Sequence, residues 1–409
     1  MSTITIPDAD QKLRDGALSE VHELVLDQEA MRAHVMQPAH TQGVVSSVGP
    51  TADELRPHII AKPAITHTFD VKGFGDALHA SLKDSTAGYV MRLRQNGTTI
   101  YTLEWNWAKR PQDGGEGWKP EVRMHVASCS KLITAMAMTK LLNEKHISYD
   151  AHIIDHLPSY WAKGFSVDKI TFRQLMTHTS GLNYGVKSSA SDFVFMKSQI
   201  AAGVPNIGKY WYQNMNFGLC RILISTINGN VAVTAPLGDS NWDFVTIQAY
   251  VAYVQKYLFN PAGVSGPSPA HATADALAYP FPVNGGGWNS GDLQTVLGGA
   301  GWHISADELL SVMGTFRRKG TIMTDQQAQT MLDSGFGIDV IQSTALGKLY
   351  NKNGAWSNAN PPGESEEQTL AYFLPQGMEL VVMANSPLGL PEQFFRGVVT
   401  NIYLENIKP

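Results

Sequence analysis

The 409-residue chain has only two cysteines, Cys129 and Cys220, so no disulfide framework is expected. Charged residues make up 16% of the sequence, the formal net charge is -5, and no basic run or basic helix face occurs, which argues against a nucleic-acid partner. The apolar runs fall short of the roughly 18–20 residues of a membrane span. The N-terminus shows no basic segment followed by an apolar one, so we expect no secretory signal and no membrane partner. The scarcity of cysteine also favours a cytoplasmic protein.

Several common site motifs are missing as well. No Gly-x-Ser-x-Gly sequence occurs, which argues against an α/β-hydrolase. His152 and His156 lie four residues apart, but the glutamate of a zincin helix and a third ligand are lacking, so a structural role is favoured. Gly285-Gly286-Gly287 is not followed by Lys-Ser or Lys-Thr and indicates a surface loop. We therefore expect neither a metal nor a cofactor.

The chain has strand-like runs near both ends and helical patterns between them. The hydrophobic content of 43% is ample for a large core. Asn96-Gly97 is typical of a two-residue hairpin turn. The expected strands are Gly88–Arg94, Thr98–Trp105, Leu346–Asn351, Thr369–Leu374 and Glu379–Ala384. The expected helices are Ala9–Met36, a short one after the capping box Thr51/Glu54, Val71–Lys83, Leu132–Leu142, one from the capping box Thr171/Gln174 to His178, Asn216–Thr226, Asp243–Leu258 and Gln393–Ile407.

This order predicts an α+β fold, with an antiparallel sheet built from both chain ends, flanked by helices, and an inserted mainly helical domain. We assign residues 1–68 to an N-terminal extension, residues 69–130 and 286–409 to the sheet domain, and residues 131–285 to the helical domain. A cleft is expected where the two domains meet.

The segment Ser128-Cys129-Ser130-Lys131 precedes the apolar run Leu132–Leu142. On a helix, Ser128 and Lys131 share one face. A hydroxyl and an amine at this spacing allow an acyl-transfer enzyme to activate serine without histidine, and a desolvated lysine can act as a proton acceptor. Taken alone, the motif is also compatible with an ordinary solvated helix start.

Three further segments follow in order: His178-Thr179-Ser180-Gly181-Leu182, Tyr212-Gln213-Asn214 and Lys352-Asn353-Gly354. Together with ASCSKLITA, YLFNPAGV, LGGAGWHIS and ELVVMANS, the chain from Phe69 to Pro409 resembles the serine β-lactamase-like superfamily. This superfamily contains class C β-lactamases, penicillin-binding DD-peptidases and family VIII esterases, together with related amidases and acyltransferases.

The resemblance implies roles for individual residues. Ser128 would be the acylated nucleophile, Lys131 its proton acceptor, and Tyr212 a second proton-transfer group. Asn214 would orient Lys131 or a substrate amide, and Lys352 would add positive charge. Gly354 would let substrate approach its strand, and the N–H groups of Ser128 and Ala355 would form the oxyanion hole.

Aromatic residues are frequent around these motifs, which favours an apolar acyl pocket, with core packing as the alternative for each. We expect Trp302, His303 and Trp356 on the substrate side. For His178, which ends an expected helix beside Gly181, packing or capping is favoured over catalysis.

The third motif reads Lys-Asn-Gly where β-lactamases and DD-peptidases usually have Lys-Thr-Gly. The missing hydroxyl and the lack of a secretory signal favour a carboxylesterase that acts on short or hydrophobic esters, with acyl transfer as a further activity. The alternatives are a β-lactamase, a DD-peptidase or a D-residue amidase, and, in another class, a non-catalytic binding or scaffold protein on the same fold. The expected partner is a small ester or amide; the oligomeric state is not predicted.

Overall fold

The computed structural model describes residues 67–409 except 188–189, 359–364 and 391–393. The helices expected at Ala9–Met36 and after Thr51 lie outside the described residues. Among the described residues, no helix is both long enough and apolar enough to cross a membrane.

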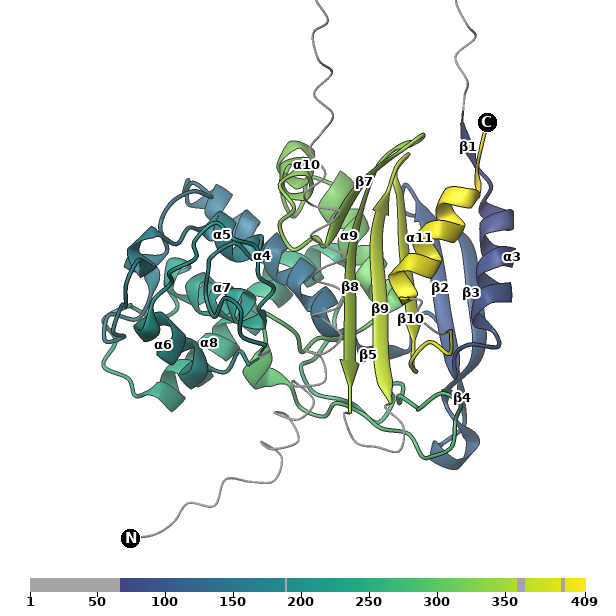
Figure 1. The fold of residues 1–409 in the computed structure, drawn as a ribbon, viewed down its shortest axis with the longest axis horizontal. Coiled ribbons are helices and arrows are strands. Elements are labelled where there is room, and N and C mark those ends of the chain that lie inside the picture. The colour runs from purple at the N-terminus through teal and green to yellow at the C-terminus, as the bar shows by residue number, and fades with distance from the viewer. Residues whose placement is uncertain (1–66, 188–189, 359–364, 391–393) are drawn as a thin grey trace, which may run out of the picture.

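A seven-stranded antiparallel sheet has the strand order β4-β3-β2-β10-β9-β8-β7 (Figure 1). Its two halves come from opposite ends of the described chain and meet where β2 pairs with β10, with Leu93 opposite Leu380. The predicted sheet built from both chain ends is therefore confirmed. The strands are β2 (Gly88–Gln95), β3 (Thr98–Lys109), β4 (Glu116–Gly117), β7 (Val340–Thr344), β8 (Gly347–Ser357), β9 (Glu366–Leu374) and β10 (Met378–Ala384).

The turn between β2 and β3 is the one that the sequence predicts. Asn96 and Gly97 have φ angles of 51° and 84°. Asparagine and glycine tolerate this left-handed conformation, which matches the twist of the flanking strands.

Most of the expected helices are present. They include α3 (Val71–Leu82), α4 (Ser130–Glu144), α5 (Phe172–Met176), α7 (Asn214–Ile227), α8 (Asp239–Val254) and α11 (Phe395–Glu405). The capping box of Thr171 and Gln174 is formed, but α5 ends before His178, whose φ of 56° is incompatible with a continuing helix. Three helices were not expected: α6 (Phe193–Ala202), α9 (Ala306–Arg318) and α10 (Asp325–Asp333).

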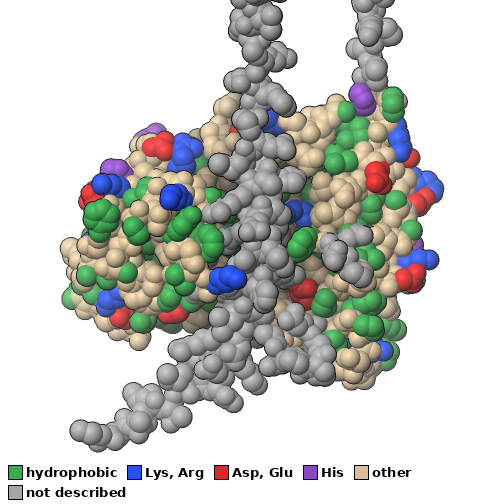
Figure 2. All heavy atoms as spheres, in the orientation of Figure 1, with side chains coloured by type: hydrophobic (Ala, Val, Ile, Leu, Met, Phe, Trp, Pro, Cys, Tyr) green, Lys and Arg blue, Asp and Glu red, His purple; other side chains and the backbone are tan. Residues whose placement is uncertain are grey.

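Apolar side chains fill both faces of the sheet. On one face, α3 and α11 contribute Phe74, Leu78, Val399 and Tyr403 to a core that includes Leu93 and Leu380. On the other face, α4 and α9 pack against the sheet, and α5 to α8 lie beyond α4 (Figure 1). On the face shown in Figure 2, acidic and basic side chains are scattered among apolar and polar ones.

Two short pairings outside this sheet complete the described strands. β1 (Thr68–Phe69) pairs with β11 (Ile407–Lys408). β5 (Arg123–His125) pairs with β6 (His303–Ser305), and we call this pair the β5–β6 ribbon. The ribbon ends two residues before Ala127, so it carries the segment that contains Ser128.

Candidate active site

Ser128 lies in the middle of a 3₁₀ turn, Ala127–Cys129, directly before α4. Ala127 has a φ of 44°, a strained value for a residue with a side chain, and such strain is kept only where the surroundings enforce it. Val126 N–H donates to the Trp302 carbonyl at 2.9 Å, and the Cys129 thiol donates to the Lys352 carbonyl at 3.4 Å. Burial raises the pKa of Cys129 to about 12, so this neighbour is an unreactive thiol.

Lys131 extends from the first turn of α4 toward Ser128. Its Nζ lies 2.8 Å from Ser128 Oγ, 2.5 Å from Asn214 Oδ1 and 2.6 Å from the Gly299 carbonyl oxygen. The amide and carbonyl oxygens can only accept hydrogen bonds, so Lys131 donates to both. In the charged amine, a third hydrogen is directed at Ser128 Oγ, and in the neutral amine a lone pair can take its place. This contact is compatible with Lys131 as the acceptor of the serine proton, which stays a prediction.

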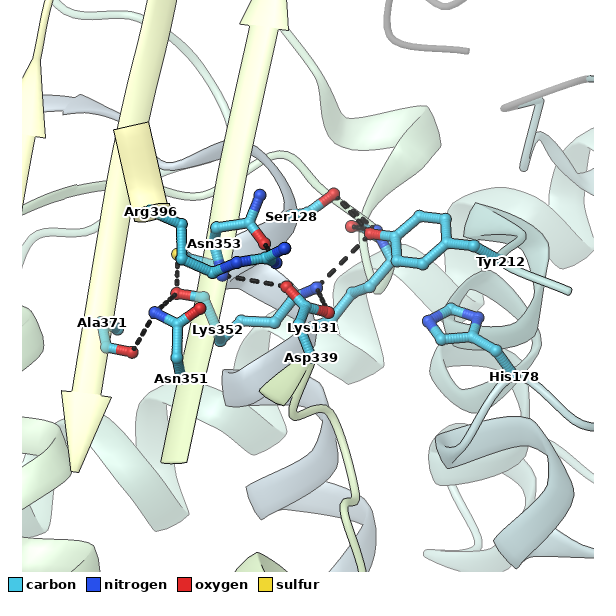
Figure 3. Close-up of polar contacts among 12 residues, drawn as sticks. Ser128, Lys131, His178, Tyr212, Asp339, Asn351, Lys352, Asn353, Ala371 and Arg396 are labelled. Carbon is cyan, nitrogen blue, oxygen red and sulfur yellow. Dashed lines mark hydrogen bonds and ion pairs between the residues drawn. The ribbon is translucent and has the colours of Figure 1, made fainter. Parts of the chain in front are cut away.

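Tyr212 reaches Ser128 from the segment just before α7 (Figure 3). Its hydroxyl donates to Ser128 Oγ at 2.8 Å, and Lys352 Nζ donates to the Tyr212 hydroxyl at 3.5 Å. Lys352 also donates to Asp339 Oδ1 at 2.6 Å. The structure thus brings Ser128, Lys131, Tyr212, Asn214 and Lys352 into one hydrogen-bonded group, although they come from three separate segments of the chain.

His178 supports Tyr212 from the side away from Ser128 (Figure 3). Its Nδ1 accepts hydrogen bonds from Gln213 N–H at 3.3 Å and from the Asn216 amide at 3.2 Å. Burial, followed by the nearby charges of Lys131 and Lys352, holds the pKa of His178 well below its usual value of 6.5. His178 is therefore a neutral ring that positions Tyr212.

The open edge of β8 runs beside the Ser128 turn. β7 covers this edge only as far as Asn351, which pairs with Val340. A Cβ on Gly354 would lie 2.3 Å from the Val126 carbonyl oxygen and 2.8 Å from Ser128 N, so only glycine fits here.

The same edge orients the expected oxyanion donors. Asn353 N–H points to it and donates to Asp339 Oδ2 at 3.0 Å. Because N–H groups alternate between the two edges of a strand, Ala355 N–H points to this edge as well, toward Ser128. The geometry is compatible with Ser128 and Ala355 as the oxyanion pair, which stays a prediction.

Trp302, His303 and Trp356 lie in the interior. Trp302 is 1% exposed, and its indole N–H donates to the Tyr250 hydroxyl at 3.2 Å. His303 is also 1% exposed, and its ring centroid lies 5.3 Å from that of His125. Trp356 is 3% exposed and packs edge-on against His125. These side chains pack around the ribbon that carries Ser128, and the substrate contact expected for them stays a prediction.

Two partners of the candidate catalytic lysines were not anticipated from the sequence. The Gly299 carbonyl is held next to Lys131 because Gly301 N–H donates to His125 Nε2, and a Cβ on Gly299 would lie only 2.8 Å from the Asn214 carbonyl oxygen. The run Gly298-Gly299 is thus the sequence signal of this close approach. Asp339 forms an ion pair with Lys352, but no sequence motif around Asp339 indicates this contact.

The comparisons with known proteins agree with this geometry. A family model described as Beta-lactamase matches residues 74–387, and the chain belongs to this family. The family consists of serine hydrolases with the β-lactamase fold. The resemblance inferred from the motifs is confirmed.

Individual relatives among the curated proteins share less than 30% sequence identity with this chain over the aligned residues. The esterase/beta-lactamase LipL of Mycobacterium tuberculosis is 28% identical over 137 residues, which cover 32% of this chain and 31% of LipL. Esterase EstB of Burkholderia gladioli is 24% identical over 267 residues, which cover 56% of this chain and 65% of EstB. The chain thus spans less than two-thirds of either relative.

A solved structure shares the fold over a longer stretch. A beta-lactamase/D-alanine carboxypeptidase from Pseudomonas syringae is 14% identical and aligns with a TM-score of 0.61, covering 82% of this chain and 99% of that one.

Proposed function

We propose that the protein is a carboxylesterase that hydrolyses short or hydrophobic esters through an acyl-enzyme on Ser128. The observation that carries the proposal is that Lys131 Nζ and the Tyr212 hydroxyl each lie 2.8 Å from Ser128 Oγ. A serine hydroxyl is a poor nucleophile until a neighbouring base accepts its proton.

In the proposed acylation, Ser128 Oγ forms a bond with the ester carbonyl carbon and its proton passes to Lys131. The N–H groups of Ser128 and Ala355 bind the developing oxyanion. The bond to the alcohol oxygen then breaks, and Tyr212 donates a proton to that oxygen while Lys131 returns one to Tyr212. Because Lys131 and Tyr212 both contact Ser128, they form a coupled proton-transfer pair. In deacylation, water follows the reverse route, and another alcohol or an amine in its place would give acyl transfer.

The surroundings of Lys352 support neutral esters over anionic substrates. Lys352 and Asp339 are both buried and form an ion pair, which offsets much of the positive charge that would attract a carboxylate. Asn353 occupies the position of the usual threonine and supplies no hydroxyl to a substrate carboxylate. The Arg396 guanidinium, which donates to Asn353 Oδ1 at 3.1 Å, adds a positive charge beside this strand and favours the second candidate below. EstB, which is named as an esterase, agrees with the choice of esters, whereas LipL is named as an esterase/beta-lactamase and is compatible with both candidates.

Partly exposed aromatic side chains adjoin the site. Trp211, next to Tyr212, packs on Tyr184 with ring centroids 5.5 Å apart. Such a surface suits an apolar acyl or alcohol group better than a charged one.

The test is the turnover of p-nitrophenyl butyrate by the wild type and by Ser128→Ala. The substitution should lower kcat at least about 10³-fold. Equal rates in the two proteins would refute the assignment.

β-Lactam or D-residue amide hydrolysis is the second candidate, because Lys352 contacts Tyr212 and could still orient a substrate carboxylate. Nitrocefin, assayed beside the ester, separates the two. Faster turnover of nitrocefin in kcat/KM would replace the esterase proposal.

A further inference from the structure

A second group of reactive side chains lies at the β5–β6 ribbon, and the proposed hydrolysis makes no use of it. His271, Asp275 and His303 each present one metal-ligating atom, and these atoms all lie within 4.8 Å of one another. Among the described residues, this is the one group of three or more histidine, cysteine or carboxylate side chains arranged in this way. The sequence pattern pointed only to His152 and His156 as possible metal ligands, because His303 follows Asp275 by 28 positions and no local spacing links them.

Three of the four ring nitrogens in this group are buried without a hydrogen-bond partner among the described residues. His303 is 1% exposed, and within the described part of the chain neither of its ring nitrogens has a hydrogen-bond partner. In the same part of the chain, Nδ1 of His271 also lacks one. Buried ring nitrogens are nearly always satisfied by protein, water or an ion, so a buried histidine with two unsatisfied nitrogens indicates a ligand.

We propose that His271, Asp275 and His303 bind a Zn²⁺ ion. Two imidazoles and one carboxylate are a donor set that zinc accepts as three protein ligands, whereas Mg²⁺ and Ca²⁺ prefer oxygen ligands alone. Glu367 lies outside this group of three. Its Oε2 accepts a hydrogen bond from His125 Nδ1 at 3.0 Å, and within the described residues its Oε1 has no partner.

The group needs only a small contraction to close on a metal. Zinc–ligand bonds of roughly 2.0–2.2 Å put tetrahedral ligand atoms about 3.4 Å apart. His271 Nδ1 and Asp275 Oδ2 are already 3.9 Å apart. The side chain of His271 is 15% exposed, so it has room to move, while Asp275 Oδ2 is oriented by the N–H of Ala272 at 2.8 Å.

The ion would link the segment His271–Asp275 to His303 on β6, and so to the β5–β6 ribbon, which precedes Ser128. The backbones of Ser268 and His303 already exchange hydrogen bonds, and Ala276 N–H donates to the Arg123 carbonyl on β5. Gly299, which orients Lys131, lies four residues before His303. The proposed role is therefore structural, and a water-derived nucleophile on zinc forms no part of it.

The test uses the full chain and has a readout other than hydrolysis. The protein is stripped with a chelator, titrated with ZnCl₂ by calorimetry, and its bound zinc is counted by mass spectrometry. The wild type should bind one Zn²⁺ per chain, and saturating zinc should raise its melting temperature by several degrees. His271→Ala and Asp275→Asn should each weaken binding by at least about 10-fold.

Three controls accompany the zinc titration. His152→Ala removes an exposed histidine outside the group and should bind zinc like the wild type. His271→Ala alters the least buried ligand, so its melting temperature in chelator reports whether it still folds. Ser128→Ala should bind zinc normally, which separates this site from the proposed hydrolysis.

A cobalt titration gives an independent signal, because four-coordinate Co²⁺ with nitrogen and oxygen ligands has visible absorption bands that the hydrated ion lacks. The absence of stoichiometric zinc from the wild type, or equal affinity in the wild type and the folded His271→Ala and Asp275→Asn variants, would overturn the proposal.

Discussion

The imidazole ring of His178 stacks on the phenol ring of Tyr212, with their centroids 4.2 Å apart and their planes inclined by 28°. The backbone reinforces the stack, because Trp211 N–H donates to the His178 carbonyl at 2.8 Å. The left-handed φ of His178 turns the chain out of α5 and toward Tyr212. The end of one helix thus fixes the hydroxyl that meets Ser128.

Substitutions of His178 should separate positioning from proton transfer. His178→Ala removes the stacked ring, so we expect kcat for p-nitrophenyl butyrate to fall about 10-fold with little change in KM. His178→Phe keeps a flat ring and should stay within about threefold of the wild type. Steady-state kinetics of both variants test this, and a Phe variant as inactive as a Ser128 variant would instead assign a chemical role to the imidazole.

The burial of His178 also affects stability at acidic pH. The folded protein keeps His178 neutral, whereas the unfolded chain protonates it below its usual pKa of 6.5. The contribution of His178 to the free energy of unfolding is therefore fully present above pH 6.5, and it decreases as the pH falls below that value. At pH 5 the folded protein therefore has less of this contribution than at pH 7.5.

Urea unfolding of the wild type and His178→Phe at pH 7.5 and pH 5 measures this contribution. The wild type should lose more of its free energy of unfolding than the variant between the two pH values. Parallel losses would show that His178 does not titrate differently in the folded and unfolded states.

Gly354 sets the distance between β8 and the Ser128 turn. Gly354→Ala places a methyl group against Ser128 N, so we expect at least a 100-fold loss of kcat because the oxyanion donors separate. Overpacking should also lower the free energy of unfolding by about 1–3 kcal/mol. The matched control is Gly397→Ala in α11, where nothing lies within 4 Å of the added Cβ. Comparable activity of the two variants would refute the proposed close approach.

The ion pair of Lys352 and Asp339 should control substrate charge. Asp339→Asn leaves the lysine charge unopposed, so the ratio of kcat/KM for p-nitrophenyl hemisuccinate to that for p-nitrophenyl butyrate should rise about 10-fold. Asp333→Asn breaks an exposed ion pair with Lys348 and serves as the control. An unchanged ratio in Asp339→Asn would exclude charge compensation as the basis of ester preference.

Local patterns in the sequence were sufficient for many elements of the fold. The Asn96-Gly97 turn and the capping box at Thr171 depend on neighbouring residues alone, and both are formed. The capping boxes of Ser305 with Glu308 and of Thr324 with Gln327 carry the same kind of signal for α9 and α10, but were not recognised.

Elements that depend on distant partners were harder to predict. The local pattern ended this strand at Asn351, and only the resemblance placed Lys352-Asn353-Gly354 on a strand. β8 runs on to Ser357, because pairing with β9 overrides the low strand propensity of these residues. β5 and β6 have three residues each, too few for an alternating pattern.

In the candidate site, too, local patterns were predictable from the sequence, whereas contacts between distant residues were not. The spacing of Ser128 and Lys131 brought these two residues to attention, and the resemblance added Tyr212 and Lys352. The contacts of Gly299 with Lys131 and of Asp339 with Lys352 join residues 168 and 13 positions apart. No local pattern records which acceptor a buried lysine meets after folding.

The most direct measurement of the central claim is the rate at which a fluorophosphonate probe labels the protein, followed by intact mass and peptide mapping. We expect one label on Ser128 in the wild type and none in Ser128→Ala. Lys131→Met and Tyr212→Phe should each label at least about 100-fold more slowly, and the double variant should be much less impaired than the product of the two effects, because the groups act as a unit. Labelling of Ser128→Ala at the same stoichiometry, or of Lys131→Met at the wild-type rate, would contradict an active site built on Ser128, Lys131 and Tyr212.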